Sequence, residues 1–216
     1  MPRLKKPTQR DEALNELRVG LYFKSLNYRI VEWEPPGNNN KKGEYSITPN
    51  GEDVVFVEVK SPGWEGQLDP EEQRSVRKKQ PKYMPGEIRC ARGQWPQVRA
   101  CIERAYPKFL PDCKNLLVIA DDLRVPLDDL PMEIALYNPH LLSTSLAEFG
   151  CSEYGFGCFA SNKFENIGGV ARFENRLLSS RSYFSDCYRL YLYPNTFGLK
   201  QLPPFRRPAP TPHKTH

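Results

Sequence analysis

Hydrophobic positions near the N-terminus recur at helical spacing, and they predict a helix from Asp11 to about Lys24. Leucines at steps of three to five residues form its apolar side; they are Leu14, Leu17, Leu21 and Leu26. Asp11 is a candidate N-cap for this helix. Glu12 and Glu16 would lie one turn apart and off the leucine side, so the helix carries two acids that the core does not need.

The next hydrophobic runs are short and rich in β-branched and aromatic residues, which is typical of strands. One strand is predicted at 28–33, and two more at 44–48 and 53–60 are joined by Asn50-Gly51, a strong hairpin signal. Residues 61–93 show little apolar periodicity, so we expect them to form a long connection between the strand at 53–60 and the next helix. The remaining expected elements are a helix at 96–109, a strand at 115–120, a helix at 129–137 and late strands at 169–173 and 188–193.

The order of helix, three strands, helix and strand predicts an α/β fold, with a later strand added beside the meander through a helical crossover. The 216 residues suit one sizeable core. We therefore expect a single domain at 11–200, preceded by a basic arm at 1–10. Five of the 21 prolines fall within 203–212, so the basic segment 201–216 is expected to be an extended, mobile tail.

The net charge of +5 is unevenly distributed along the chain. Residues 72–108 hold ten Lys and Arg against three Glu, and both ends of the chain are basic. A solvated charged surface explains this block, and so does a surface that binds the phosphates of a polyanion. The candidates for nucleic-acid contact are Arg74, Arg77, Lys78, Lys79, Lys82, Gln97, Arg99, Arg104 and Lys108.

Several classes of protein are disfavoured by composition. No run approaches 18 uncharged apolar residues, and the N-terminus lacks the apolar stretch of a secretory signal, so no membrane partner is expected. None of the six cysteines forms a CxxC pair, which favours reduced thiols in a cytoplasmic compartment. With three histidines in the chain, zinc sites and Ser-His-Asp or Cys-His catalysis have few residues to use.

The candidate chemistry lies in residues 43–62. Strand periodicity puts Glu58 and Lys60 on one face of a largely apolar strand, where unpaired charges are costly. Across the hairpin, Glu44 falls roughly opposite Glu58. Two facing carboxylates repel each other unless a cation neutralises them, and a hard divalent cation with oxygen ligands, Mg²⁺ or Mn²⁺, does this most simply.

These residues resemble the motif of the PD-(D/E)xK nuclease superfamily, which has the restriction-endonuclease-like fold. Glu58-Val59-Lys60 matches the (D/E)xK element, Glu44 stands where the first acid is expected, and Glu16 matches the helix acid. The resemblance covers about residues 10–121 and implies a restriction-endonuclease-like core there, with a C-terminal α/β extension at about 122–200. Gly43-Glu44 replaces the Pro-Asp of the motif, which keeps Asp53 as a second candidate for the first acid.

The resemblance implies a metal-dependent nuclease that hydrolyses phosphodiester bonds, most readily in DNA, and it allows a homodimer. Its implied ion ligands are Glu44, Glu58, the Val59 carbonyl and Glu16. Lys60 would orient the attacking water and stabilise transition-state charge. The basic block would follow the nucleic-acid backbone, with aromatic side chains stacking on unpaired bases. The aromatic residues are Trp64, Tyr83 and Trp95.

Other interpretations stay open from the sequence. Glu58 and Lys60 also suit an ordinary ion pair on a solvated strand, and Glu16 suits a helix surface. A catalytically silent nucleic-acid-binding or scaffold protein could share the same fold. A structural α/β protein that binds another protein through acidic patches is a more distant alternative.

Overall fold

The computed structural model describes residues 7–49, 51, 53–62, 94–120, 127–137, 157–160, 162–175 and 188–205. Helices and strands alternate along this part of the chain. They are α1 (Pro7–Ser25), β1 (Arg29–Trp33), β2 (Tyr45–Thr48), β3 (Val55–Lys60), α3 (Gln94–Ala105), β4 (Lys114–Ala120), α4 (Asp129–Leu136), β5 (Gly169–Asn175) and β6 (Tyr188–Pro194). Short 3₁₀ turns are η2 (Asn38–Asn40), η4 (Tyr106–Lys108), η8 (Cys158–Ala160) and η9 (Asn162–Phe164).

The six strands form one mixed sheet in the order β1-β2-β3-β4-β5-β6. Strands β1, β2 and β3 are a meander of antiparallel neighbours, β4 and β5 run parallel to β3, and β6 returns antiparallel to β5. Helix α3 lies in the crossover between the parallel strands β3 and β4. This confirms the predicted α/β class and the predicted order of elements, and it shows that the two late strands extend the same sheet.

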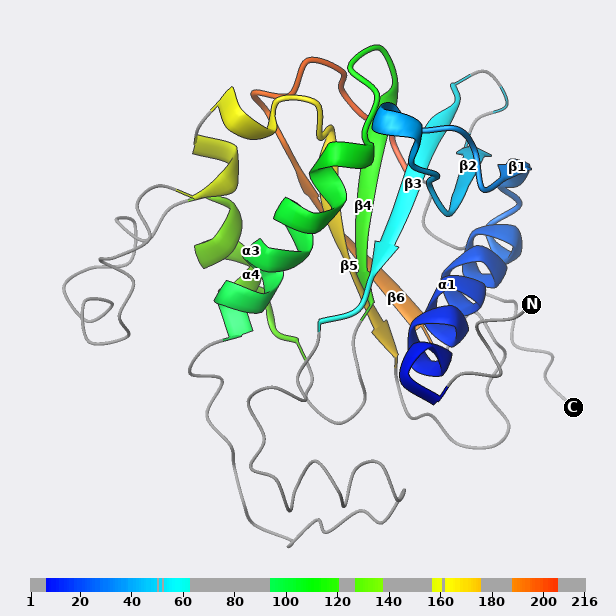
Figure 1. The fold of residues 1–216 in the computed structure, drawn as a ribbon, viewed down its shortest axis with the longest axis horizontal. Helices are drawn as coiled ribbons and strands as arrows, with labels where there is room; N and C mark the ends of the chain where they lie inside the picture. The colour runs from blue at the N-terminus through cyan, green and yellow to red at the C-terminus, as the bar shows by residue number, and fades with distance from the viewer. Residues whose placement is uncertain are drawn as a thin grey trace, which may run out of the picture.

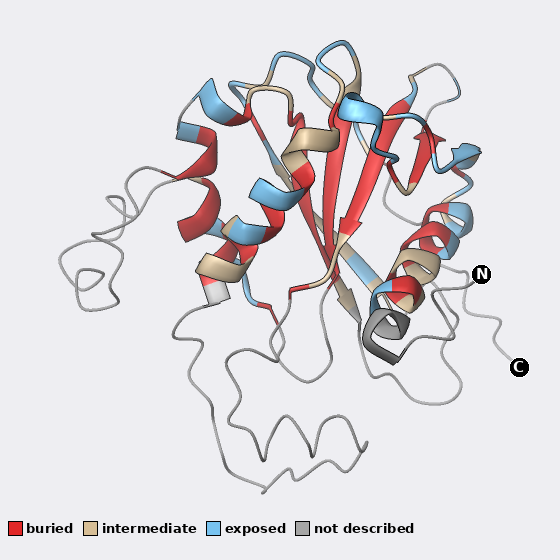
Figure 2. Ribbon diagram, viewed as in Figure 1, coloured by how far each residue is buried: buried red, intermediate tan, exposed pale blue. Residues whose placement is uncertain are grey.

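Helices cover both faces of the sheet (Figure 1). Side chains alternate between the faces along a strand. In β4, Leu117 and Ile119 belong to the core under α3 and α4, whereas Leu116 and Val118 belong to the core under α1. The central strands β3, β4 and β5 are accordingly buried along most of their length (Figure 2).

Two helix boundaries differ from the prediction. Helix α1 begins at Pro7, so Asp11 lies inside the helix and is not its N-cap. Proline is tolerated in a first turn because that turn's N–H groups have no intrahelical acceptor. Helix α3 ends at Ala105 and passes into η4, short of the predicted end at Phe109. Pro107 lacks the N–H that an α-helix would need there.

Two predictions about exposed segments are wrong. Trp95 was expected to stack on bases, but it is 7% exposed and packs in the core beneath α3. The start of the expected mobile tail is packed on the fold: the Phe205 ring lies 5.8 Å from the Tyr28 ring and 6.3 Å from the Phe23 ring, measured between centroids. Apolar burial outweighs the extended tendency of the prolines that precede it. Residues 206–216 lie outside the described part of the chain.

A buried arginine fastens α4 to the sheet. Arg172 on β5 donates to the Leu127 carbonyl at 2.6 Å and to the Asp129 carboxylate at 2.9 Å. The Tyr193 hydroxyl donates to the same carboxylate, and the hydrogen bond from Tyr193 and the charge of Arg172 lower the pKa of Asp129. No helix in the described ranges is long and apolar enough to cross a membrane.

Candidate active site

The β2–β3 hairpin places two carboxylates opposite each other. Tyr45 pairs with Val57 in the antiparallel register, and the backbone N–H of Glu44 donates to the Val57 carbonyl at 3.1 Å. Glu44 therefore faces Glu58, the next residue along β3, as the hairpin pattern predicted. Glu58 is fully buried, since strand β3 lies between β2 and β4.

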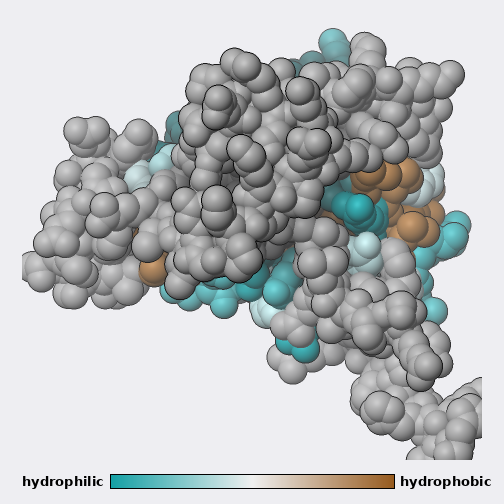
Figure 3. All heavy atoms as spheres, turned by 90° about the horizontal axis from the view of Figure 1, so that it is seen from below, coloured by the Kyte–Doolittle hydropathy of each residue, from teal (hydrophilic) through white to brown (hydrophobic). Residues whose placement is uncertain are grey.

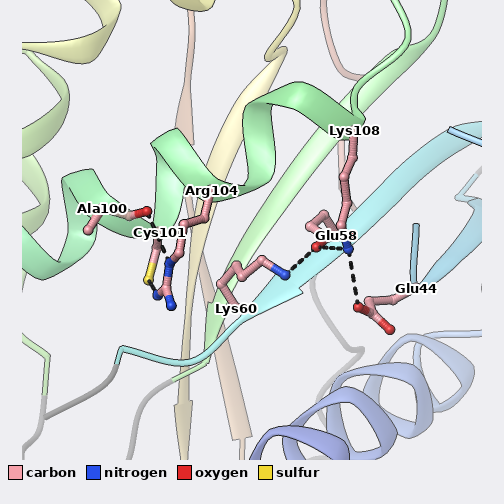
Figure 4. A network of polar contacts seen from close by, with 7 residues as sticks. All are labelled: Glu44, Glu58, Lys60, Ala100, Cys101, Arg104 and Lys108. Carbon is pink, nitrogen blue, oxygen red and sulfur yellow. Dashed lines mark hydrogen bonds and ion pairs between the residues drawn. The ribbon is translucent and has the colours of Figure 1, made fainter. Parts of the chain in front are cut away.

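A lysine from η4 bridges these two carboxylates (Figure 4). Lys108 Nζ lies 2.5 Å from Glu58 Oε1 and 3.8 Å from Glu44 Oε1. Because both distances share the same nitrogen atom, the two oxygens are at most 6.3 Å apart. The predicted convergence of Glu44 and Glu58 is confirmed, and the group that joins them comes from a segment about 50 residues further along the chain.

Lys60 completes the charged cluster. Its ammonium forms an ion pair and a hydrogen bond with Glu58 Oε1, two residues away on the same strand face. Burial alone would lower the pKa of Lys60, but the charge of Glu58 and the hydrogen bond to it outweigh burial and raise that pKa. Lys60 is therefore held in its protonated form.

A polar cleft opens beside these residues, with a volume of about 230 Å³. Its lining consists of Glu12, Glu16, Glu44, Val59, Lys60, Ser61 and Lys108. Helix α1 is fixed over the end of β3 by a 2.9 Å hydrogen bond from the Asn15 amide to the Ser61 hydroxyl. Seen from the side at which β3 ends, hydrophilic side chains lie beside hydrophobic ones on the α1 side of the molecule (Figure 3).

The surroundings of Glu44 disfavour the charged form of its carboxyl group. Burial and the negative charges of Glu16 and Glu58 raise the pKa of Glu44 from 4.5 to about 7. Lys108 and Lys60 oppose this shift without cancelling it. Burial is the largest cause of the shift and the two neighbouring acids add to it, so a positive charge bound beside Glu44 would favour its ionised form.

The donor set fits a hard divalent cation. Glu58 Oε2 is buried without a hydrogen-bond partner among the described residues, which is costly for a charged oxygen, and Glu44 supplies a second carboxylate within 6.3 Å. Carboxylate oxygens are the ligands that Mg²⁺ and Mn²⁺ prefer. Across the described ranges, however, no three His, Cys, Asp or Glu side chains are already grouped as a metal-binding set. Glu16 lines the cleft and acts on Glu44 through its charge.

The structure gives a local reason why glycine, and not proline, precedes Glu44. A Cβ atom at Gly43 would lie 2.4 Å from Cζ of the Phe56 ring, which packs directly over the glycine. The Gly43 N–H also donates to the Pro35 carbonyl at 3.0 Å. A proline could make neither the close approach nor the hydrogen bond.

The position of Lys108 is set by the loop that contains η2. The Asn39 amide donates to the Pro107 carbonyl at 3.2 Å. A Cβ atom at Gly37 would lie 2.6 Å from the Lys108 carbonyl, so glycine allows the two backbones to approach closely. On the other side, Phe109 is fully buried and its ring meets Phe56 edge-on at 5.9 Å.

The predicted nucleic-acid contacts fall in different places. Gln97 has a buried side-chain oxygen for which the described part of the chain provides no hydrogen-bond partner. Arg99 pairs with Glu103 on its own helix at 3.4 Å, and Arg104 donates to the Ala100 carbonyl and to the Cys101 sulfur. Lys108 belongs to the carboxylate cluster. The other candidates lie outside the described residues; they are Arg74, Arg77, Lys78, Lys79 and Lys82.

The second candidate for the first acid lies elsewhere. Asp53 forms an ion pair with Lys114 at the start of β4. Because β3 and β4 run parallel, this pair lies at the opposite end of the strands from Lys60. The structure therefore separates Asp53 from Glu58 and leaves Glu44 as the acid that faces it.

Three residues that line the cleft were not among its predicted ion ligands or its catalytic lysine; they are Glu12, Ser61 and Lys108. Glu12 lies one helical turn from Glu16, and this spacing is a signal that could have placed both acids on the cleft. Lys108 was grouped with the basic block, where the resemblance implied a contact to the metal site or to the nucleic-acid backbone. No local pattern shows that its side chain points towards Glu58. The position of Lys108 depends on the η2 loop, which lies nearly 70 residues earlier in the chain.

Comparison of the chain with protein-family models, curated proteins and solved structures finds no significant match.

Proposed function

We propose that this chain is a metal-dependent nuclease of the PD-(D/E)xK type that hydrolyses phosphodiester bonds, most readily in DNA. The observation that carries the proposal is the convergence of Glu44, Glu58 and Lys60 at one end of a buried strand pair. Burying these charged groups costs free energy, and the packing of the core does not require them. Functional chemistry is the simplest reason for keeping it.

The arrangement of elements supports the proposal. A helix carrying Glu16 precedes the antiparallel strands β1 to β3, and α3 then leads to the parallel strand β4. This is the order expected for a restriction-endonuclease-like core. The extension contributes α4, β5 and β6, which enlarge the same sheet and the same apolar core.

The acids have the role of holding a cation and the substrate phosphate near it. Glu44 and Glu58 would hold Mg²⁺ or Mn²⁺ with the Val59 carbonyl, and Glu16 would add negative charge from α1. When bound, the ion acidifies water and polarises the phosphate. Among described residues, Glu44, Glu16 and Val59 line the cleft, and the fully buried Glu58 lies beside it.

Lys60 has a role distinct from that of the acids. Because its pKa is raised, it stays a cation at neutral pH and cannot serve as the base that removes a proton from water. Its ammonium can donate a hydrogen bond to the attacking water and attract the negative charge that builds on the phosphate oxygens. Lys60 is therefore proposed as an electrostatic stabiliser of the transition state.

The test is cleavage of plasmid, linear duplex and single-stranded DNA in Mg²⁺, Mn²⁺ or EDTA. The parent should cut in at least one metal and not in EDTA. Lys60→Ala should lower the rate by roughly 10²–10³-fold and leave DNA binding nearly unchanged. Lys42→Ala is the matched control, because Lys42 pairs with Glu34 at the exposed end of β1. A Lys60→Ala protein that cuts as fast as the parent would remove Lys60 from the mechanism.

A catalytically silent nucleic-acid-binding protein is the second candidate. The favouring observation is that Glu58 already contacts two ammonium groups, those of Lys60 and Lys108. Such pairing neutralises the carboxylate without a metal. Tight binding of nucleic acid by a parent protein that cuts no substrate in any divalent metal would decide for this candidate.

A further inference from the structure

The Lys108 ammonium lies where a cation shared by the two carboxylates would lie. It is 2.5 Å from Glu58 Oε1 and 3.8 Å from Glu44 Oε1, and its side chain is 19% exposed. Lys60 also contacts Glu58, but it comes from the same strand and lies to one side of the carboxylate pair (Figure 4). Lys108 is thus the bridging ammonium of the cluster.

The backbone and the head group of Lys108 are constrained differently. The backbone is held by the Asn39 hydrogen bond to Pro107, by close contact with Gly37 and by the buried Phe109. The side chain is a flexible four-carbon stem that ends in a compact charge. It lines the cleft, so the ammonium can leave the carboxylates by rotation of side-chain bonds while η4 stays in place.

We propose that Lys108 is an exchangeable internal counterion, whose ammonium holds Glu44 and Glu58 together until a divalent cation binds and displaces it into the cleft. This inference rests on the proposed function, since it requires a divalent cation at these carboxylates. It deepens that function by assigning Lys108, which lies outside the Glu58-Val59-Lys60 motif, to the control of metal affinity.

Electrostatics gives the reason for exchange. A divalent cation bound to both carboxylates would lie within about 4 Å of an ammonium that kept its contacts, and charges of like sign repel strongly at that distance. Without any cation, the two facing carboxylates, whose oxygens lie at most 6.3 Å apart, would repel each other instead. The displaced ammonium would remain at the mouth of the cleft, where a substrate phosphate is attracted to it.

The first test measures Mn²⁺ binding by isothermal titration calorimetry, without substrate. Lys108→Met should bind Mn²⁺ at least roughly tenfold more tightly than the parent, because the competing charge is gone. Lys108→Arg keeps the charge and should bind as weakly as the parent. Lys114→Met is the matched control: Lys114 is also a partly buried lysine paired with a carboxylate, Asp53, but at the far end of the strands.

The second test uses the unaltered protein. Brief treatment with an amine-reactive acylating reagent, followed by mass spectrometry, reports how accessible each lysine is. Adding Mn²⁺ should increase modification of Lys108 severalfold and leave Lys114 unchanged. This measurement stands even if Lys108→Met fails to fold.

The outcomes separate the two proposals. Equal Mn²⁺ affinity in the parent and Lys108→Met, with unchanged modification of Lys108, would overturn the exchange and leave the metal site in place. Absence of Mn²⁺ binding in every variant would overturn both the exchange and the metal-dependent nuclease. Tighter binding in Lys108→Met together with increased modification of Lys108 in the parent would support both.

Discussion

At the scale of single residues, the carboxylates at the cleft are unfavourable for folding but suit the proposed chemistry. Glu58 is fully buried, and one of its carboxylate oxygens has no hydrogen-bond partner within the described ranges. Glu44 faces it across the hairpin, and its pKa is raised by burial and by the neighbouring acids. Such groups destabilise the metal-free protein, so substitutions that remove charge should stabilise it while abolishing the chemistry.

Glu44→Gln should make the metal-free protein more stable at pH 8 but not at pH 4. The Glu44 carboxyl has a pKa of about 7 when folded against 4.5 ordinarily. The folded state therefore binds the proton more tightly, and stability falls as pH rises from 4.5 to 7. The gain at pH 8 should be on the order of 2–3 kcal/mol. Urea unfolding in EDTA at both pH values measures it.

The control for that prediction is Glu34→Gln. Glu34 is an exposed partner of Lys42, so its replacement should change stability by less than about 1 kcal/mol at either pH. A Glu44→Gln protein with the same pH dependence as the parent would show that Glu44 is not the group responsible.

Gly43→Ala should destabilise the protein by about 1–3 kcal/mol, because the added Cβ would overlap the Phe56 ring. Gly20→Ala is the control: its Cβ would lie 3.2 Å from the ring of the exposed Trp33, and alanine favours the helix. Thermal unfolding of the two variants compares the sites. Loss of stability only in Gly20→Ala would contradict the account of why glycine precedes Glu44.

At the scale of elements, segments far apart in sequence hold the site together. The η2 loop positions Lys108 through Asn39, and the Asn15–Ser61 hydrogen bond fixes α1 against the end of β3. The C-terminal segment packs on the same end of the sheet as α1, with Phe205 against Phe23. The Asn39 and Phe205 contacts each join an element of the site to a segment that carries none of its chemistry, whereas the Asn15–Ser61 bond joins two elements that both line the cleft.

Phe205→Ala should lower the free energy of unfolding by about 1–3 kcal/mol, because the ring packs against Phe23 and Tyr28. Phe197→Ala is the matched control, since Phe197 is 72% exposed and its loss should change stability by less than about 0.5 kcal/mol. Urea unfolding of both variants gives the comparison. Equal stability of the two variants would mean that the tail contributes no packing energy.

At the scale of the whole molecule, charge is distributed unevenly along the sequence. The cleft gathers carboxylates and their two lysines, while the basic block and both chain ends carry an excess of positive charge. This distribution suits the proposed substrate, a nucleic acid whose phosphates would be attracted by many positive side chains and hydrolysed at one site.

Simultaneous charge reversal of Arg77, Lys78 and Lys79, which lie outside the described residues, should weaken DNA binding about equally for all sequences. Each lost phosphate contact should reduce the slope of log affinity against log salt by roughly 0.9. Fluorescence anisotropy at several salt concentrations measures the slope. Reversal of the exposed Lys41 and Lys42 serves as the control, and an unchanged slope in the triple variant would make the block a solvated surface.

The sequence by itself determined the local parts of this protein. Alternation and hairpin chemistry located β2 and β3 and placed Glu44 opposite Glu58, because strand periodicity and the Asn-Gly turn act over a few residues. The same local signals predicted the order of helices and strands. They misplaced the ends of α1 and α3, where single prolines and capping contacts decide.

The tertiary structure decided which distant residues share the site. Lys108 carries no local sign that it bridges Glu44 and Glu58, because its direction follows from the η2 loop and the buried Phe109. Trp95 is buried and Phe205 is partly buried for the same kind of reason, since both pack against apolar side chains from distant parts of the chain. Periodicity is a property of neighbouring residues, whereas charge pairing and burial depend on the whole packed chain.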